Sequence, residues 1–130
     1  MIHVVSCFII KDNKILILKR SDSVRTYKGK WATVSGYIES NEEPFETAIK
    51  EIEEEIGLKE SDVALVREGN LIYVDDDWVV HPYLFKTSSD KIKTDWEHVE
   101  YKWIKPKELK NYDTVPKLKE SLESVLGYEL

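Results

Sequence analysis

The stretch Gly36–Leu58, GYIESNEEPFETAIKEIEEEIGL, carries the strongest helix signal in the chain, from about Pro44 to Ile56. Proline is tolerated in the first turn of a helix, and Gly57 is the residue type expected at a left-handed helix end. The run EIEEE at 51–55 places four carboxylates in five positions of this helix. Like charges three or four residues apart repel by roughly 0.2–0.5 kcal/mol per pair, so the crowding needs a physical reason.

A helical wheel at about 100° per residue separates this segment into three faces. One is an apolar stripe that should face the core, formed by Phe45, Ala48, Ile49, Ile52 and Ile56. The second holds Glu46, Lys50 and Glu53, where the order of Glu46 and Lys50 favours an ion pair in solvent. The third holds Glu51, Glu54 and Glu55, beside the stripe. Converging carboxylates suit Mg²⁺ or Mn²⁺, although a glutamate-rich helix can also be a merely solvated surface.

The rest of the chain predicts a sheet. Two apolar runs around the turn Asp12–Asn13 predict a β-hairpin, and Ser21–Lys30 is expected to be a polar loop. Gly36, within the short strand pattern WATVSGYIE, indicates a bulge or a close backbone approach. Further strands are expected in DVALVREGNLIYV, WVVHPYLFKTS and VEYKWI, with a helix in TVPKLKESLESVLGYEL. We therefore expect an α/β fold with a mixed sheet sandwiched by helices.

Composition limits the class of protein. The chain has 130 residues, of which 42% are hydrophobic and 34% charged, which is typical of one globular domain over residues 1–130. No apolar run approaches the about 18 residues of a membrane span, and no signal-peptide pattern opens the sequence, so we expect a cytoplasmic protein without membrane contact. The single cysteine, Cys7, is expected to be a buried structural thiol.

Charge is distributed unevenly along the chain. The net charge is −6, and the segment 39–60 contains nine glutamates against two lysines, a local charge of −7. The remainder therefore carries +1. An acidic chain is poorly suited to binding duplex nucleic acid. A local acidic cluster instead suits a hard divalent cation.

Read as a pattern, Gly36–Leu58 resembles the signature of the Nudix hydrolases, G-x5-E-x7-R-E-U-x-E-E-x-G-U, in which U is a bulky aliphatic residue. Every fixed position agrees except Lys50, which stands where the family has arginine. The resemblance continues more loosely from KGKW before this stretch to EHVEYKWIKPKEL after it. It implies an α/β/α sandwich around a mixed sheet, and metal-dependent hydrolysis of a nucleoside diphosphate linked to another group. Many members of the family dimerise, so the resemblance also allows a homodimer.

The resemblance also implies roles for particular residues. The metal-binding and catalytic carboxylates become Glu51, Glu54 and Glu55, and the Gly36 carbonyl joins the coordination. Glu42 is expected to support the loop and helix geometry. In the family, the planar guanidinium of the arginine holds the neighbouring glutamate. Lys50 keeps the positive charge but cannot bind in that bidentate way. An enzyme with a low rate is therefore one alternative.

Two carboxylates compete for the role of general base, and one arginine stands out as a phosphate ligand. Glu51 can accept the proton of the attacking water from the helix, and Glu97 can do so from the loop before EYKWI; we favour Glu97. Several basic residues lie between Lys19 and Lys30, and among them Arg20 is predicted to bind substrate phosphate, because it ends a strand and can bind bidentately.

The substrate is expected to be a small nucleotide, and we favour a nucleoside triphosphate cleaved to the monophosphate and pyrophosphate. The alternatives are a nucleotide sugar, ADP-ribose or a dinucleoside polyphosphate, or a nucleotide-binding sensor with little turnover. Tyr73 lies near where some dinucleoside-polyphosphate enzymes carry a tyrosine. Tryptophans in sheet proteins usually belong to the core, which is our expectation for Trp31, Trp78, Trp96 and Trp103, although each could stack a base.

Overall fold

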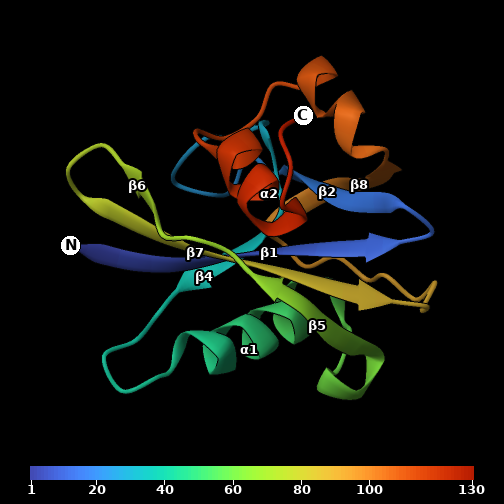
Figure 1. The fold of residues 1–130 in the computed structure, drawn as a ribbon, viewed down its shortest axis with the longest axis horizontal. Helices are drawn as coiled ribbons and strands as arrows, with labels where there is room; N and C mark the ends of the chain where they lie inside the picture. Colours follow the sequence, from blue (N-terminus) through green and yellow to red (C-terminus); the bar gives the residue numbers. More distant parts are fainter.

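A computed structural model describes residues 1–130 and contains an eight-stranded mixed sheet between two α-helices (Figure 1). The strands are β1 (Ile2–Lys11), β2 (Lys14–Arg20), β3 (Trp31–Ala32), β4 (Val34–Tyr37), β5 (Val63–Glu68), β6 (Ile72–Val74), β7 (Trp78–Thr87) and β8 (His98–Ile104). The α-helices are α1 (Pro44–Ile56) and α2 (Leu118–Leu126), and the short 3₁₀ helices are η1 (Glu60–Asp62) and η2 (Pro106–Asn111).

The central strand β1 has two different partners along one of its edges. Along the other edge it pairs with β7 in parallel from Ile2 to Ile10. Its first half pairs with β4, from Val4 to Cys7, and its last two residues pair with β2 across the predicted turn, where Asp12 and Asn13 both have positive φ. Because β2 and β4 share one edge of β1 in this way, they diverge from each other beside the middle of β1.

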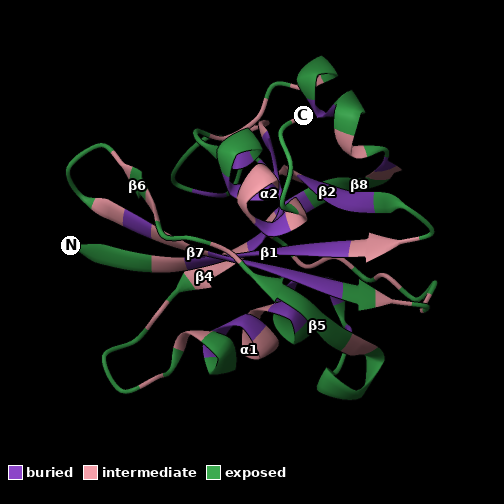
Figure 2. Ribbon diagram, in the orientation of Figure 1, coloured by how far each residue is buried: buried purple, intermediate pink, exposed green.

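Alternate residues of the central strands build two cores, one on each face of the sheet (Figure 2). On the α1 face, Cys7 and Ile9 of β1 pack with Ile52 and Ile56 of the helix. The α2 face has a matching cluster that contains Phe8, Ile15, Ile17, Leu84, Leu118, Leu122 and Val125. Full burial of a side chain such as Ile52 contributes roughly 1.5–3 kcal/mol to folding. The expected sandwich is confirmed, and so is the burial of Cys7.

Helix α1 begins and ends where the sequence predicts. It starts at Pro44, and Gly57 caps it with φ 76°, its N–H donating to the carbonyl of Glu53. Within the apolar stripe, Ala48, Ile52 and Ile56 are buried and Ile49 is half-buried, whereas Phe45 is 37% exposed and packs against Tyr83 and Phe85. The expected pair of Glu46 with Lys50 is not formed, since the Lys50 ammonium binds Glu42 instead.

The stretch DVALVREGNLIYV forms two strands, β5 and β6, with a break at Gly69. The Gly69 N–H donates to the carbonyl of Pro82, and a Cβ at this position would lie 2.5 Å from the Ser124 hydroxyl of α2. A residue with a side chain would therefore crowd α2 at this position. None of the helices is both long and apolar enough to cross a membrane.

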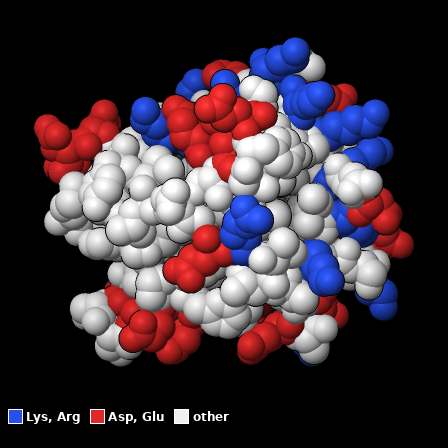
Figure 3. Space-filling view, in the orientation of Figure 1, with Lys and Arg blue, Asp and Glu red and all other residues white.

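Acidic side chains gather in several patches on the surface. Figure 3 shows them along the lower edge, over α1 and the loop before it, over α2, and at the β6–β7 turn, Asp75–Asp77. Lysines gather on the opposite side, over β8 and η2, where Lys105, Lys107 and Lys110 lie. The acidic helix is thus separated from most of the protein's positive charge.

Candidate active site

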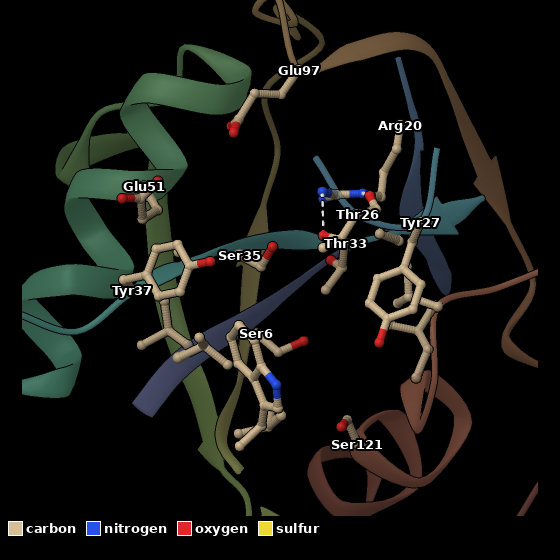
Figure 4. Close-up of a pocket in the computed structure, with 18 of the residues that line it drawn as sticks. Ser6, Arg20, Thr26, Tyr27, Thr33, Ser35, Tyr37, Glu51, Glu97 and Ser121 are labelled. Carbon is tan, nitrogen blue, oxygen red and sulfur yellow. Dashed lines mark hydrogen bonds between the residues drawn. The ribbon is translucent and has the colours of Figure 1, made fainter. Parts of the chain in front are cut away.

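A cavity of about 540 Å³ opens where β2 and β4 diverge, between α1 and the loop before β8. Its polar residues come from six segments: Ser6, Arg20, Thr26, Tyr27, Thr33, Ser35, Tyr37, Glu51, Glu54, Asp95, Glu97 and Ser121. Figure 4 shows Glu51 and Tyr37 on one side, with Arg20 and Tyr27 across the cavity from them. The predicted residues Gly36, Glu51, Glu54, Glu97 and Arg20 all line this space.

Gly36 of β4 leaves room for the Glu51 side chain of α1. A Cβ at Gly36 would lie 2.3 Å from the carboxyl carbon of Glu51, closer than any real contact of that kind. The glycine therefore leaves the space that the Glu51 side chain fills. Burial raises the pKa of Glu51, and so does the neighbouring Glu54 carboxylate.

The three carboxylates of the third helix face have very different surroundings. Glu54 is exposed at the cavity, whereas Glu55 is only 1% exposed and lies behind it in the core. One Glu55 oxygen, Oε1, accepts the backbone N–H of Ser35 at 3.3 Å, and the other, Oε2, has no hydrogen-bond partner. A buried unsatisfied polar atom costs about 1–3 kcal/mol. Burial, followed by the adjacent Glu51 carboxyl, raises the pKa of Glu55 well above its usual range.

These carboxylates fit the requirements of a divalent cation in chemistry, although no three Asp, Glu, His or Cys side chains are already grouped as a metal-binding cluster. Four carboxylates (Glu51, Glu54, Asp95 and Glu97) line the cavity, and Arg20 is the only lysine or arginine there. The unpartnered Glu55 Oε2 supplies one further hard oxygen donor. A cation bound among these oxygens would satisfy that atom and offset the local negative charge.

Glu97 lies in the loop directly before β8, as predicted, and reaches into the cavity from above in Figure 4. The loop is tied to the end of β2, because the Glu97 carbonyl accepts the Ser21 N–H at 2.8 Å, and within the loop the Glu97 N–H donates to Asp95 Oδ1 at 3.2 Å. Burial and the nearby Asp95 carboxylate raise the pKa of Glu97, while Arg20 opposes the rise. Glu97 is therefore a stronger base than an exposed glutamate.

Arg20 ends β2 and faces the cavity with part of its guanidinium free. Its Nε donates to the Thr26 carbonyl at 2.9 Å, and one terminal nitrogen lies 3.4 Å from the Thr26 hydroxyl. An arginine has five N–H donors, so donors remain for an anion. Of the other basic residues in this region, Lys30 instead pairs with Asp113, and none lines the cavity.

A NUDIX domain model matches residues 2–125. The chain belongs to the Nudix hydrolase family. Among solved structures, a NUDIX hydrolase from Nitrosomonas europaea has a TM-score of 0.78 at 21% identity, covering 98% of this chain and 74% of that one. A C. elegans Ap4A hydrolase binary complex also has a TM-score of 0.78, at 16% identity, covering 92% of each chain.

A third structure shows the same fold as part of a larger protein. It is a bifunctional NMN adenylyltransferase/ADP ribose pyrophosphatase from Francisella tularensis, with a TM-score of 0.82 at 22% identity. The match covers 97% of this chain and 40% of that one. At these identities the likeness establishes the fold, and Nudix hydrolases generally use divalent metal ions.

The departure from the Nudix signature at Lys50 has a definite structural setting. Lys50 Nζ binds Glu42 Oε2 at 2.9 Å, and Glu42 Oε1 accepts the Thr47 hydroxyl and the Glu39 N–H. This hydrogen bonding lowers the pKa of Glu42. Glu42 thus ties the loop before α1 to the helix, as the Nudix resemblance implies, and Lys50 holds Glu42 rather than Glu51.

Sequence reasoning missed some cavity residues and misplaced two tryptophans, Trp96 and Trp78, which were expected in the core but line the cavity. Trp96 was expected in the core, but it is 67% exposed and lines the cavity mouth, because it sits in the loop that carries Glu97. Tyr37 and Trp78 line the opposite wall, with ring centroids 5.8 Å apart. Nothing in the strand patterns separated these two rings from core aromatics. Trp31 is buried, as expected.

Proposed function

We propose that this protein is a metal-dependent pyrophosphohydrolase that cleaves a nucleoside triphosphate into the monophosphate and pyrophosphate. Mg²⁺ is its proposed cofactor, and Mn²⁺ can substitute. One observation carries the proposal: a single cavity combines four carboxylates, one arginine and an aromatic pair. This combination suits a substrate with a polyanionic end and a flat apolar end.

The carboxylates explain why a cation is required. Glu51, Glu54 and Glu55, with the Gly36 carbonyl, would hold Mg²⁺, and without it these groups would repel a polyphosphate. When bound, a divalent ion polarises phosphoryl oxygens and lowers the pKa of a coordinated water. The close fit of Glu51 against Gly36 keeps the donor carboxylate fixed on a rigid helix.

Glu97 is the proposed general base. It faces the cavity from an anchored loop, and its raised pKa strengthens it as a proton acceptor. Glu51 is the competing candidate, but a carboxylate whose anionic form is stabilised by a cation is a weaker base. Glu97 therefore takes the proton of the attacking water, while Glu51 serves as a ligand.

Arg20 and the aromatic wall position the substrate. The free donors of Arg20 suit a phosphate oxygen, since guanidinium groups bind phosphates in a planar, bidentate manner. The Tyr37–Trp78 pair offers a stacking surface for a nucleobase, and such stacking contributes about 1–3 kcal/mol per base in nucleic-acid binding. A mononucleotide with its phosphates toward α1 would use both features.

The alternative substrates remain a nucleotide sugar, ADP-ribose or a dinucleoside polyphosphate. Similar structures include an Ap4A hydrolase and an ADP ribose pyrophosphatase, but their low identity supports the fold alone. Tyr73, which suggested a dinucleoside polyphosphate, is 57% exposed and does not line the cavity. No contact in the cavity favours these substrates over a triphosphate.

The test is a hydrolysis assay over a panel of nucleoside triphosphates, ADP-ribose, nucleotide sugars and dinucleoside polyphosphates, with Mg²⁺ and with EDTA. We expect Mg²⁺-dependent release of pyrophosphate and a monophosphate from a triphosphate. Release of orthophosphate alone would contradict the proposed bond cleavage. If another compound of the panel is hydrolysed faster, that compound class is the substrate. If nucleotides bind but are not hydrolysed, the protein is a nucleotide sensor.

A further inference from the structure

Only two buried side-chain nitrogen or oxygen atoms in the molecule lack a hydrogen-bond partner. They belong to two residues that lie next to each other in the folded protein. They are Oε2 of Glu55, on α1, and Nε2 of His98, on β8. Both side chains are 1% exposed, and His98 Nε2 lies 3.9 Å from Glu55 Oε1. Because buried polar atoms are nearly always paired, two exceptions side by side indicate a site with a function beyond folding.

His98 connects this carboxylate to the loop that carries Glu97. Its other ring nitrogen, Nδ1, lies 3.2 Å from Asp95 Oδ1, the same oxygen that accepts the Glu97 N–H. On the far side, Glu55 Oε1 accepts the Ser35 N–H from β4. A polar path therefore runs from β4, through Glu55 and His98, to the loop of the proposed general base, with one gap of 3.9 Å between Glu55 Oε1 and His98 Nε2.

We propose that His98 is a positioning residue that holds the Oε1 side of Glu55, so that Oε2 stays available to the divalent cation. This inference rests on the proposed function. A shift of about 1 Å brings Nε2 and Oε1 to hydrogen-bond distance. One proton is enough for a hydrogen bond between His98 Nε2 and Glu55 Oε1, and either atom can be the one that carries it. Through Asp95, the same histidine fixes the loop of Glu97 relative to α1.

Two substitutions separate this role from simple space filling. In His98→Gln the side-chain amide can reach the position of Nε2, and it offers both a donor and an acceptor to Glu55. In His98→Asn the shorter amide can replace only Nδ1, so it keeps the Asp95 contact and loses the one to Glu55. His81→Gln is the matched control, because His81 pairs with His3 and lies outside the cavity lining.

The primary readout is Mn²⁺ binding by the metal-free proteins, followed by electron paramagnetic resonance, with kcat and KM measured in parallel. We expect His98→Asn to weaken Mn²⁺ binding roughly 10–100-fold, the effect typical of groups that orient a metal ligand. It should lower kcat more than it changes KM. His98→Gln should keep most of the wild-type Mn²⁺ affinity and kcat. In a protein that already carries Glu55→Gln, adding His98→Asn should not weaken Mn²⁺ binding further.

A measurement on the wild-type protein avoids any dependence on variants that fold. The ring nitrogens of His98 can be followed by ¹⁵N NMR as diamagnetic Mg²⁺ is added. We expect the Nε2 resonance of His98 to move while those of His81 stay in place. An unchanged Nε2 resonance in a protein that binds Mg²⁺ would overturn the proposal, as would wild-type Mn²⁺ affinity in His98→Asn.

Different results would contradict the proposed function and the role of His98. If wild-type protein binds neither Mn²⁺ nor Mg²⁺, the proposed function and this inference both fail. If it binds metal and Glu55→Gln weakens that binding, but both His98 variants bind as tightly as wild type, only the role of His98 is wrong. If His98→Asn keeps affinity and His98→Gln loses it, the histidine serves Asp95 rather than Glu55.

Discussion

Helices α1 and α2 close opposite faces of one sheet, yet they bury different chemistry. The residues that α2 buries are Leu118, Ser121, Leu122 and Val125, and none of them holds an unpartnered buried atom. Those that α1 buries are Thr47, Ala48, Ile52, Glu55 and Ile56. A carboxylate with a free oxygen thus occupies a place in α1 where folding alone would favour an apolar side chain. Both helices cover a hydrophobic core, and under the proposed function α1 also buries a carboxylate, at a cost in stability, in order to bind a cation.

The largest effect is expected from removing a carboxylate of the α1 face. Glu54→Gln or Glu55→Gln should reduce hydrolysis by orders of magnitude and leave the fold intact, since each removes a proposed metal ligand. The control is Glu53→Gln, because Glu53 is exposed and does not line the cavity. Mg²⁺-dependent kcat values, with circular dichroism to check folding, provide the measurement. Near-normal turnover of both variants at saturating Mg²⁺ would end the metal-site assignment.

The next effect concerns the loop that faces α1. Glu97→Gln should lower kcat by roughly 10²–10⁴-fold, the usual contribution of a general base, with little change in Mg²⁺ affinity. Glu100→Gln, on β8 and outside the cavity lining, is the comparison variant. Should kcat persist in Glu97→Gln and vanish in Glu51→Gln, the base belongs to the helix.

A substitution on the α2 face should have the opposite profile. Leu122 is fully buried, and Leu122→Ala should cost about 2–5 kcal/mol of unfolding free energy. The kcat of the molecules that remain folded should not change, because Leu122 does not line the cavity. Urea unfolding and active-site-normalised kinetics measure the two quantities. A fall in kcat without loss of stability would show that the two faces do not divide the work in this way.

The smallest effect is expected at the position that departs from the Nudix signature. Lys50→Arg should keep or modestly raise kcat, with the change in kcat rather than KM, because arginine can pair with Glu42 and still present donors toward Glu51. Steady-state kinetics at saturating Mg²⁺ decide the point. A large loss would mean that the Lys50–Glu42 pair, at 2.9 Å, is an arrangement that only lysine maintains.

Local signals in the sequence predicted some elements of the fold, and contacts between distant segments determined the rest. Helix α1 was predicted residue by residue, because Pro44 and Gly57 are local signals that tertiary contacts do not override. The turn at 12–13 was equally local. The wheel placed Glu51, Glu54 and Glu55 on one face but could not rank their burial, since the strands packed against α1 determine it. The close approach of α2 to Gly69 is a contact between distant segments, which a local sequence pattern does not encode.

The contacts of His98 could not be predicted from the sequence, because they also join distant segments of the chain. The sequence placed His98 beside Glu97, and it gave no sign that β8 would bring the ring to Glu55, 43 positions earlier in the chain. Trp96 was misassigned because tryptophan is usually buried, whereas this one belongs to a cavity loop. The sequence pattern identified the candidate metal-binding glutamates. The residues that surround them could be identified only from the folded sheet.

The cost of the α1 carboxylates also has a pH dependence. The pKa of Glu55 is raised in the folded protein, so the folded state holds a proton that the unfolded chain releases near pH 4.5. In the absence of metal, the contribution of Glu55 to the free energy of unfolding should therefore be most favourable at low pH. It should fall as pH rises above about 4.5, and this fall should be smaller in Glu55→Gln.

The most direct test of the central claim is the order of thermal stability of wild type and Glu55→Gln at pH 8, with EDTA and then with saturating Mg²⁺. With EDTA, the account predicts that Glu55→Gln melts at the higher temperature, because it no longer buries an unpartnered carboxylate. With Mg²⁺ at 100 times its Kd, wild type should gain about 2.7 kcal/mol and become the more stable protein. An order that stays the same in both conditions would contradict the claim that α1 buries Glu55 in order to bind a cation.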